Sequence, residues 1–300
     1  MSSSNMFFRS RTHRRAISPV IATVILLAVF IALVSAALAF VDTELTSYYA
    51  NSDLASSSTF AQNYAQAVQS VGMTFGRSLS IGYGVKYAQL AFIPAALQYT
   101  ITVGSQSCLI VTGFLLSAIS ASYYSLGKNY YINYYPGKFS GLSSIGASGS
   151  FARAFATEYQ STPNSPFFLD TVVMGIPQVT NFMLTTPGSS PVNITRIYLP
   201  ELYYRNNPIP MDCSGSMGPS TEVTRFTSPT GYISAQGQGL QVETYSSTST
   251  TFQITASATP AFSSQYPLSF YHFSSSTQTF HIQSGQEIQI FIGDIEVLGV

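Results

Sequence analysis

Few residues of this 300-residue chain have the types and spacing that chemistry requires. Asp212, Ser214 and Ser216 stand two residues apart in "MDCSGSMG", and a carboxylate with two hydroxyls suits a hard cation such as Mg²⁺. His272 and His281 lie in strand-like segments with no cysteine or acid at ligand spacing. The acids are scattered singly, not paired for acid–base work. The sequence therefore indicates a protein that is not an enzyme.

The metal candidate lacks the surroundings of a metal site. Its spacing resembles the divalent-metal adhesion site of von Willebrand type A domains, which follows a buried strand and precedes a helix. Here "RNNPIP" comes before it and "GPSTEVTRFTSP" after it. Too little chain remains for the rest of such a domain. We therefore interpret residues 211–218 as a Ser-rich surface loop and expect no metal and no cofactor.

Two other features could carry covalent chemistry outside a cell. Cys108 and Cys213 are the only cysteines, and a disulfide between them would contribute up to about 4 to 5 kcal/mol in the chain-entropy model. Two buried free thiols are the alternative. Asn193 begins the only N-x-S/T sequon with an allowed middle residue, which makes it a candidate N-glycosylation site.

The charge pattern argues against nucleic-acid binding. Only 8% of the residues are charged, against about 25% in an average soluble protein. Arg9, Arg11, Arg14 and Arg15 hold four of the 12 basic residues, and the chain after them carries more acids than bases. No basic stripe is left for nucleic acid, and the clustered arginines indicate membrane topology instead.

Residues 17–41 form an apolar run without any charged side chain. At about 1.5 Å per residue, a helix of this length crosses a hydrocarbon core of about 30 Å. The arginines before it predict that residues 1–16 stay cytoplasmic and that the remainder is exported. Cleavage after Ala39, in the pattern Ala37-Leu38-Ala39, and an uncleaved anchor are both open alternatives.

A third alternative, cleavage before the apolar run, follows from a resemblance to a known family. Arg14, Arg15 and Ala16, followed by "ISPVIATVILLAV", resemble the class III signal of archaeal type IV pilins. The resemblance covers about a tenth of the chain and implies that a prepilin peptidase cuts between Ala16 and Ile17. It also implies a subunit that assembles with copies of itself or with other pilins in a surface filament.

The proline beside this signal suits the start of a helix. Pro19 disfavours the α conformation for Ser18, and proline has no N–H to leave unpaired in the first turn. Ser18 can serve as the N-cap, because its hydroxyl accepts a free amide hydrogen. The Ala16–Ile17 bond is thereby left outside the helix, where a protease can reach it.

We expect the helix to continue past the membrane segment. One apolar stripe at helical spacing supports this, and it comprises Phe60, Tyr64, Val68, Val71 and Phe75. A Ser-rich stretch predicts a bend or break at residues 51–58. After residue 76 the pattern becomes that of strands: Leu97 to Val103 alternate, and two strands flank "PGSSP" (187–191). A short helix is expected in "FARAFATEY" (151–159).

The fold class is therefore α+β, with a long N-terminal hydrophobic helix followed by a β-rich, sandwich-like region. The expected parts are a basic leader (1–16), a helix (17–76) that contains the membrane segment, a first β-rich unit (77–175) and a second one (176–300). This plan also resembles that of pilins. It implies a minor or adhesive subunit with an extracellular C-terminal region. An archaellin and a helix-anchored solute or sugar receptor are the alternatives.

Overall fold

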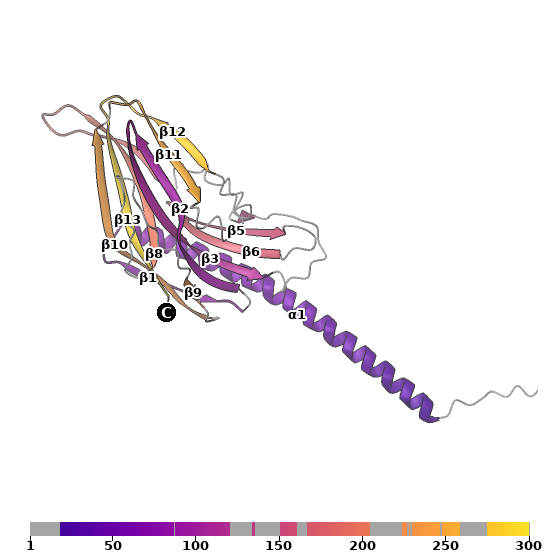
Figure 1. The fold of residues 1–300 in the computed structure, drawn as a ribbon. Helices are drawn as coiled ribbons and strands as arrows, with labels where there is room; N and C mark the ends of the chain where they lie inside the picture. Colours follow the sequence, from indigo (N-terminus) through magenta and orange to yellow (C-terminus); the bar gives the residue numbers. More distant parts are fainter. Residues whose placement is uncertain are drawn as a thin grey trace, which may run out of the picture. The chain divides into compact units, whose positions relative to one another are not determined.

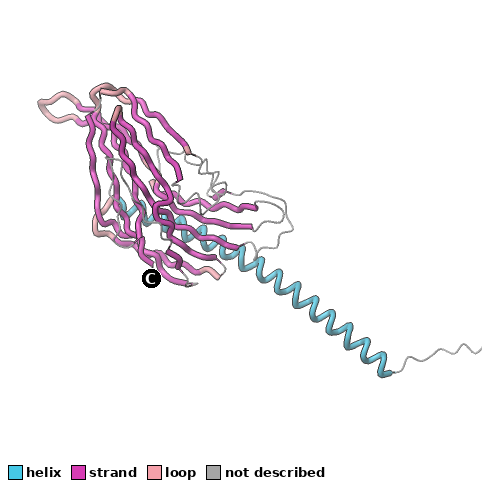
Figure 2. The backbone as a smooth tube through the Cα atoms, viewed as in Figure 1, coloured by secondary structure: helices cyan, strands magenta, loops and turns pink. Residues whose placement is uncertain are grey.

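The structure is a computed structural model, and its described residues form one long helix and thirteen strands (Figure 1). They are residues 19–86, 88–120, 134–135, 151–160, 167–204, 224–226, 228, 230–246, 248–258 and 275–299. The chain divides into two compact units, one up to Leu45 and one from Thr46 onward. The α+β class expected from the sequence is confirmed (Figure 2).

Helix α1 (Pro19–Gly72) runs without the break expected at residues 51–58. Hydroxyl and carboxylate groups of this stretch find partners that are compatible with a helix. Thr59 donates to the Ala55 carbonyl oxygen at 2.9 Å, and the Ser57 hydroxyl lies 2.9 Å from that of Ser117 in the interior. Asp53 accepts the backbone N–H of Lys86 at 2.7 Å. The Ser57 and Asp53 contacts tie this stretch of the helix to β3 (Gln106–Ser120) and to the connection after β1 (Ser78–Gly84), which favours the helix although serine is a weak helix former.

The first sheet has five strands in the order β1-β10-β13-β8-β7. The pairs are antiparallel except β13 and β8, which run parallel, with Ile290 opposite Ile197. Its strands are β1 (Ser78–Gly84), β7 (Gln178–Leu184), β8 (Val192–Tyr204), β10 (Thr230–Ser246) and β13 (Glu287–Gly299).

The second sheet has the order β12-β11-β2-β3-β6-β5-β4, with β9 paired to β2. All of its pairs are antiparallel. Its strands are β2 (Ala88–Val103), β3 (Gln106–Ser120), β4 (Tyr134–Tyr135), β5 (Ala152–Gln160), β6 (Phe167–Gly175), β9 (Thr224–Phe226), β11 (Thr251–Ala258) and β12 (Ser276–His281). The short helix expected in residues 151–159 is wrong, because β5 pairs with β6 along its whole length.

One core lies between the two sheets. The predicted alternation in β2 is confirmed, since Leu97, Tyr99, Ile101 and Val103 are all buried. They share a cluster with β8 and β13 of the other sheet, which includes Ile197 and Ile290. The turn between β2 and β3 uses Gly104 with a positive φ of 62°, a conformation that glycine adopts without strain.

A second core lies between the sheets and the Thr46–Gly72 part of α1. Four members of the predicted stripe are buried there: Phe60, Tyr64, Val68 and Val71. Phe75, which was placed in the same stripe, follows the end of the helix and is 62% exposed. The Tyr64 hydroxyl donates to the Ser234 carbonyl oxygen at 3.2 Å. The aromatic stripe is therefore core, as its spacing predicted.

Strands from 77–175 and from 176–300 are present in both sheets. β1 lies at the edge of a sheet whose other strands all follow residue 176. β11 and β12 lie in the same sheet as β2, β3, β5 and β6. The boundary expected near residue 175 therefore does not separate the sheets from one another.

Candidate functional site

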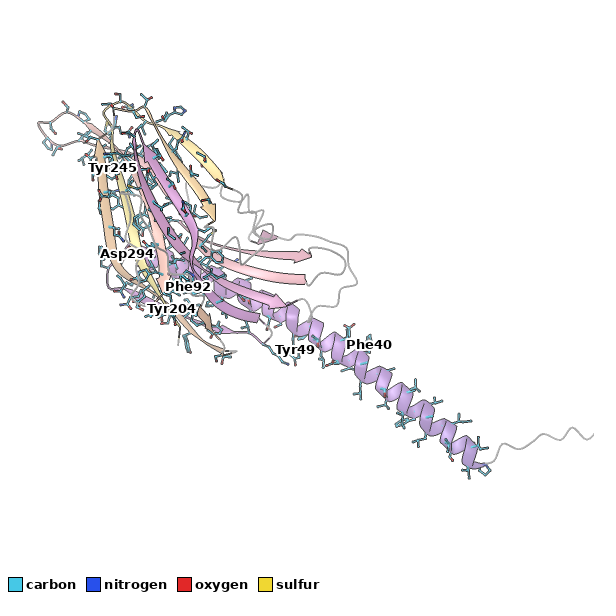
Figure 3. All side chains as sticks on the ribbon, in the orientation of Figure 1. Phe40, Tyr49, Phe92, Tyr204, Tyr245 and Asp294 are labelled. Atoms are coloured by element: carbon cyan, nitrogen blue, oxygen red, sulfur yellow. The ribbon has the colours of Figure 1, made fainter. Side chains whose placement is uncertain are left out.

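The first unit exposes apolar side chains along its described helix. Residues 19–46 are long and apolar enough to cross a membrane, although a signal sequence has the same properties. Phe40 points away from the helix axis in Figure 3 and is 66% exposed. Two hydroxyls bond back to the helix itself, Thr23 to the Val20 carbonyl oxygen at 2.8 Å and Thr43 to that of Ala39 at 2.9 Å. Such hydroxyls need no water as a partner.

The leader lies outside the described residues. This applies to the basic pair Arg14 and Arg15, the expected cleavage positions Ala16 and Ile17, and the expected N-cap Ser18. Pro19 is the first described residue and also the first residue of α1. Cleavage between residues 16 and 17 and the N-cap therefore stay predictions.

The metal candidate is also outside the described residues, since Asp212, Ser214 and Ser216 fall in the range 205–223. Within the part of the chain that the structure describes, no three histidine, cysteine or acidic side chains are placed to hold a metal ion. His281 ends β12 and is exposed, whereas His272 is not described.

Cys108 is buried in the core between the sheets. Its sulfur lies 2.6 Å from the Tyr245 hydroxyl oxygen. Cys213 is the only other cysteine of the chain, but it lies outside the described residues. The Cys108–Cys213 pairing therefore stays a prediction.

The sequon lies at the start of β8. The Asn193 side-chain amide donates to the Gln283 side-chain oxygen. Thr195 is buried, and its hydroxyl donates to Asn181 at 2.7 Å and accepts from Gln286 at 2.6 Å. A glycosylated asparagine amide keeps one N–H, so the contact with Gln283 is compatible with a glycan, and occupancy of Asn193 stays a prediction.

A cavity of about 290 Å³ lies where α1 ends against the first sheet. Its charged groups are Arg196 and Asp294, and its apolar wall includes Leu240 and Phe291. The Arg196 guanidinium carbon lies 4.5 Å from the centroid of the Phe291 ring. Burial raises the pKa of Asp294 above its usual value, while a hydrogen bond from Gln241 at 2.8 Å opposes that rise. We call this the helix-end cavity.

Aromatic rings and one cation gather just beyond the apolar run, in the second unit. Tyr48 and Tyr49 meet edge to face with their ring centroids 5.9 Å apart. The Lys86 ammonium nitrogen lies 3.9 Å from the centroid of the Tyr49 ring. Figure 3 labels Tyr49 on α1. Sequence reasoning did not find this group, although two adjacent tyrosines beyond an apolar run are a recognisable signal.

The chain matches no protein-family model, no curated protein and no solved structure.

Proposed function

We propose that the chain is an exported, membrane-anchored subunit of a type IV pilus-like archaeal surface filament. A prepilin peptidase would remove the leader between Ala16 and Ile17. The apolar helix would then assemble with copies of itself or with other pilins, and the β-rich unit would face outward for adhesion, cell contact or filament capping. The observation that supports this best is the exposure of apolar side chains all around residues 19–45.

Three exposed residues illustrate this all-round exposure. Ile25, Leu26 and Leu38 are 54%, 74% and 65% exposed. At 3.6 residues per turn they lie about 100 to 140° apart around the helix axis. A helix on the surface of a soluble protein has an apolar stripe on one face only. Residues 19–45 therefore need apolar surroundings on every side, which a bilayer supplies before assembly and neighbouring apolar helices supply in a filament.

The remainder of α1 differs from residues 19–45, because one of its faces is buried. Between Thr46 and Gly72 the helix buries one face against the β-rich unit. A helix with this division can leave the bilayer without loss of its contacts to the β-rich unit. A helix that is exposed and apolar in its first part and packed against the β-rich unit in its second part supports a filament subunit more than an ordinary secreted protein.

Sequencing of the mature N-terminus tests the proposed cleavage. Ile17 as the first residue supports a pilin-type subunit, Phe40 contradicts it, and Met1 or Ser2 indicates an uncleaved anchor. The double substitution Arg14→Gln, Arg15→Gln should block processing, whereas the matched pair Arg9→Gln, Arg11→Gln should leave it intact. Purified surface filaments that contain the Ile17 form would then show assembly.

The helix-end cavity favours one second candidate, a helix-anchored receptor for a solute or sugar. It combines an apolar wall with the charged groups Arg196 and Asp294. A receptor would be recovered as a membrane-bound monomer and would lose ligand binding on Leu240→Trp, which fills the cavity. A filament subunit would be recovered in filaments regardless of that substitution.

A further inference from the structure

We propose that the β-rich unit binds a saccharide in a cleft that also holds Asn193, the asparagine of the sequon. The cleft has a volume of about 500 Å³ and is lined by residues near the end of β7, the start of β8, the end of β12 and the connection between β12 and β13. We call it the sequon cleft. It shares no lining residue with the helix-end cavity. The proposal concerns the β-rich unit alone and does not depend on the apolar helix or on filament assembly.

The lining of the sequon cleft suits an uncharged ligand that is rich in hydroxyls. Its described residues include no lysine, arginine or acidic residue, so they offer no counter-charge to a phosphate, a carboxylate or an amine. The polar groups are amides and the imidazole of His281, while Met183 and Ile282 supply apolar surface. A sugar ring has the same combination, with hydroxyls around its edge and C–H groups on its faces. The volume of the cleft lies within the range of about 300 to 1,000 Å³ that is typical of sites for small molecules.

A chain of hydrogen bonds fixes the orientation of one amide in the cleft. The backbone N–H of Gln283, which can only donate, donates to Gln286 Oε1 at 2.9 Å. The Gln286 amide nitrogen therefore donates to the Thr195 hydroxyl at 2.6 Å, and that hydroxyl gives its single hydrogen to Asn181 Oδ1 at 2.7 Å. Thr195 and Gln286 are buried. The Asn181 amide nitrogen thus keeps two N–H donors that have no partner among the described residues.

Asn193 and Gln283 add an acceptor and a further donor group. The Asn193 side-chain amide donates to the Gln283 side-chain oxygen. This contact leaves the Asn193 carbonyl oxygen able to accept and the Gln283 amide nitrogen able to donate. A sugar hydroxyl both donates and accepts, so it can pair with both kinds of group. Because the buried hydrogen bonds already hold Asn181 in place, binding orders little that was mobile before.

The saccharide can come from two sources that share this chemistry. If the sequon is occupied, the first sugar is attached to Asn193 and begins in the cleft, while the remaining amide N–H keeps the contact with Gln283. If the sequon is unoccupied, the cleft is open to a saccharide from outside, which would give the β-rich unit an adhesive function. The experiment below distinguishes the two sources.

Methionine methyl groups can report binding without any change to the cleft. The full-length chain, in detergent, carries methionine with a ¹³C methyl group and is prepared from its own cells and from a bacterial host without N-glycosylation. Met183 lines the cleft and is 62% exposed. Met73 is 65% exposed and lines the helix-end cavity, so it is the internal control. The probes are the methyl glycosides of glucose, galactose, mannose and N-acetylglucosamine.

In the unglycosylated chain, we expect at least one glycoside to shift the Met183 methyl resonance saturably and to leave that of Met73 unchanged. Asn181→Asp keeps the acceptor for the Thr195 hydroxyl but loses both N–H donors. It should weaken binding at least about tenfold, equivalent to about 1.4 kcal/mol. Asn63→Asp makes the same change at an exposed position of α1 and should leave binding unchanged. Near-UV circular dichroism checks the fold of each variant.

The chain from its own cells identifies the source of the saccharide. Nuclear Overhauser effects between the Met183 methyl group and sugar protons, with no binding of added glycosides, identify the glycan on Asn193 as the occupant. Binding of added glycosides by this chain identifies an external saccharide. The proposal is overturned if no glycoside shifts Met183 and no such Overhauser effect is seen, or if Asn181→Asp binds as well as the original. Sequencing of the mature N-terminus tests the filament subunit separately, so a failure here leaves that proposal standing.

Discussion

Gly237 of β10 lies against the end of α1, and it allows a quantitative test. A Cβ added there would lie 2.6 Å from the Val71 carbonyl oxygen and 2.8 Å from that of Thr74. The Gly237 carbonyl accepts from Gly76 N–H, and its own N–H donates to the Arg77 carbonyl oxygen, both at 3.0 Å. We therefore predict that Gly237→Ala destabilises the protein.

The size of the effect follows from these distances. Ordinary contact for a Cβ begins at 3.4 Å, so the neighbours must move by about 0.8 Å, and they are backbone atoms that cannot rotate away. Overpacking of this kind costs about 1 to 3 kcal/mol. Alanine also gives the unfolded chain less conformational entropy than glycine does, and this stabilises the folded state by about 0.4 to 1 kcal/mol. We expect a net loss of about 1.3 kcal/mol in the free energy of unfolding, the difference between the midpoints of these two ranges.

Gly82→Ala is the matched control in the same sheet. Its added Cβ would meet the Tyr232 ring at 3.3 Å, and Tyr232 is 60% exposed and free to shift. This variant should be as stable as the original or more stable by up to about 1 kcal/mol. Guanidinium unfolding of the full-length chain in detergent, followed by the near-UV circular dichroism of its tyrosines, compares the two. Equal stability of Gly237→Ala and Gly82→Ala would refute the reasoning.

Three other substitutions test the interior. Because burial raises the pKa of Asp294, the folded state takes up its proton before the unfolded state does, and stability from this group rises as pH falls from 7 toward 4. Asp294→Asn should raise the unfolding midpoint at pH 7 and flatten this rise, and a midpoint unchanged at every pH contradicts it. Tyr64→Phe removes a donor to the Ser234 carbonyl oxygen and should cost about 1 kcal/mol in the same guanidinium titration. Asp53→Ala removes the acceptor for Lys86 N–H and should speed hydrogen exchange of that amide more than about tenfold, for a loss of about 1.5 to 3 kcal/mol.

Local patterns in the sequence predicted much of the secondary structure. Leu97 to Val103 alternate because one side of β2 faces the core, and alternation is visible within a single strand. The buried face of α1 around Tyr64 was visible for the same reason, at the helical period. Segments of this kind carry their own signal.

Features set by distant partners could not be predicted in this way. Residues 152–160 are rich in alanine and looked helical, yet they form β5 because β6 supplies hydrogen-bond partners along its whole length. Nothing near β1 indicates that it pairs with β10, about 150 residues later. The Lys86 contact with Tyr49 joins two elements in the same way. Register and sheet membership depend on the whole chain.

The position of β13 bears on how the β-rich unit forms during synthesis. Every other described strand precedes β13 in the chain, yet β13 lies between β10 and β8 in the first sheet. Until residues 287–299 leave the ribosome, β10 and β8 have no strand to join them, and the isoleucines of β13 are missing from the core. A chain that stops early therefore lacks the middle of this sheet and keeps two open strand edges, which favour aggregation. The first sheet can therefore be completed only after the chain has been synthesised through β13.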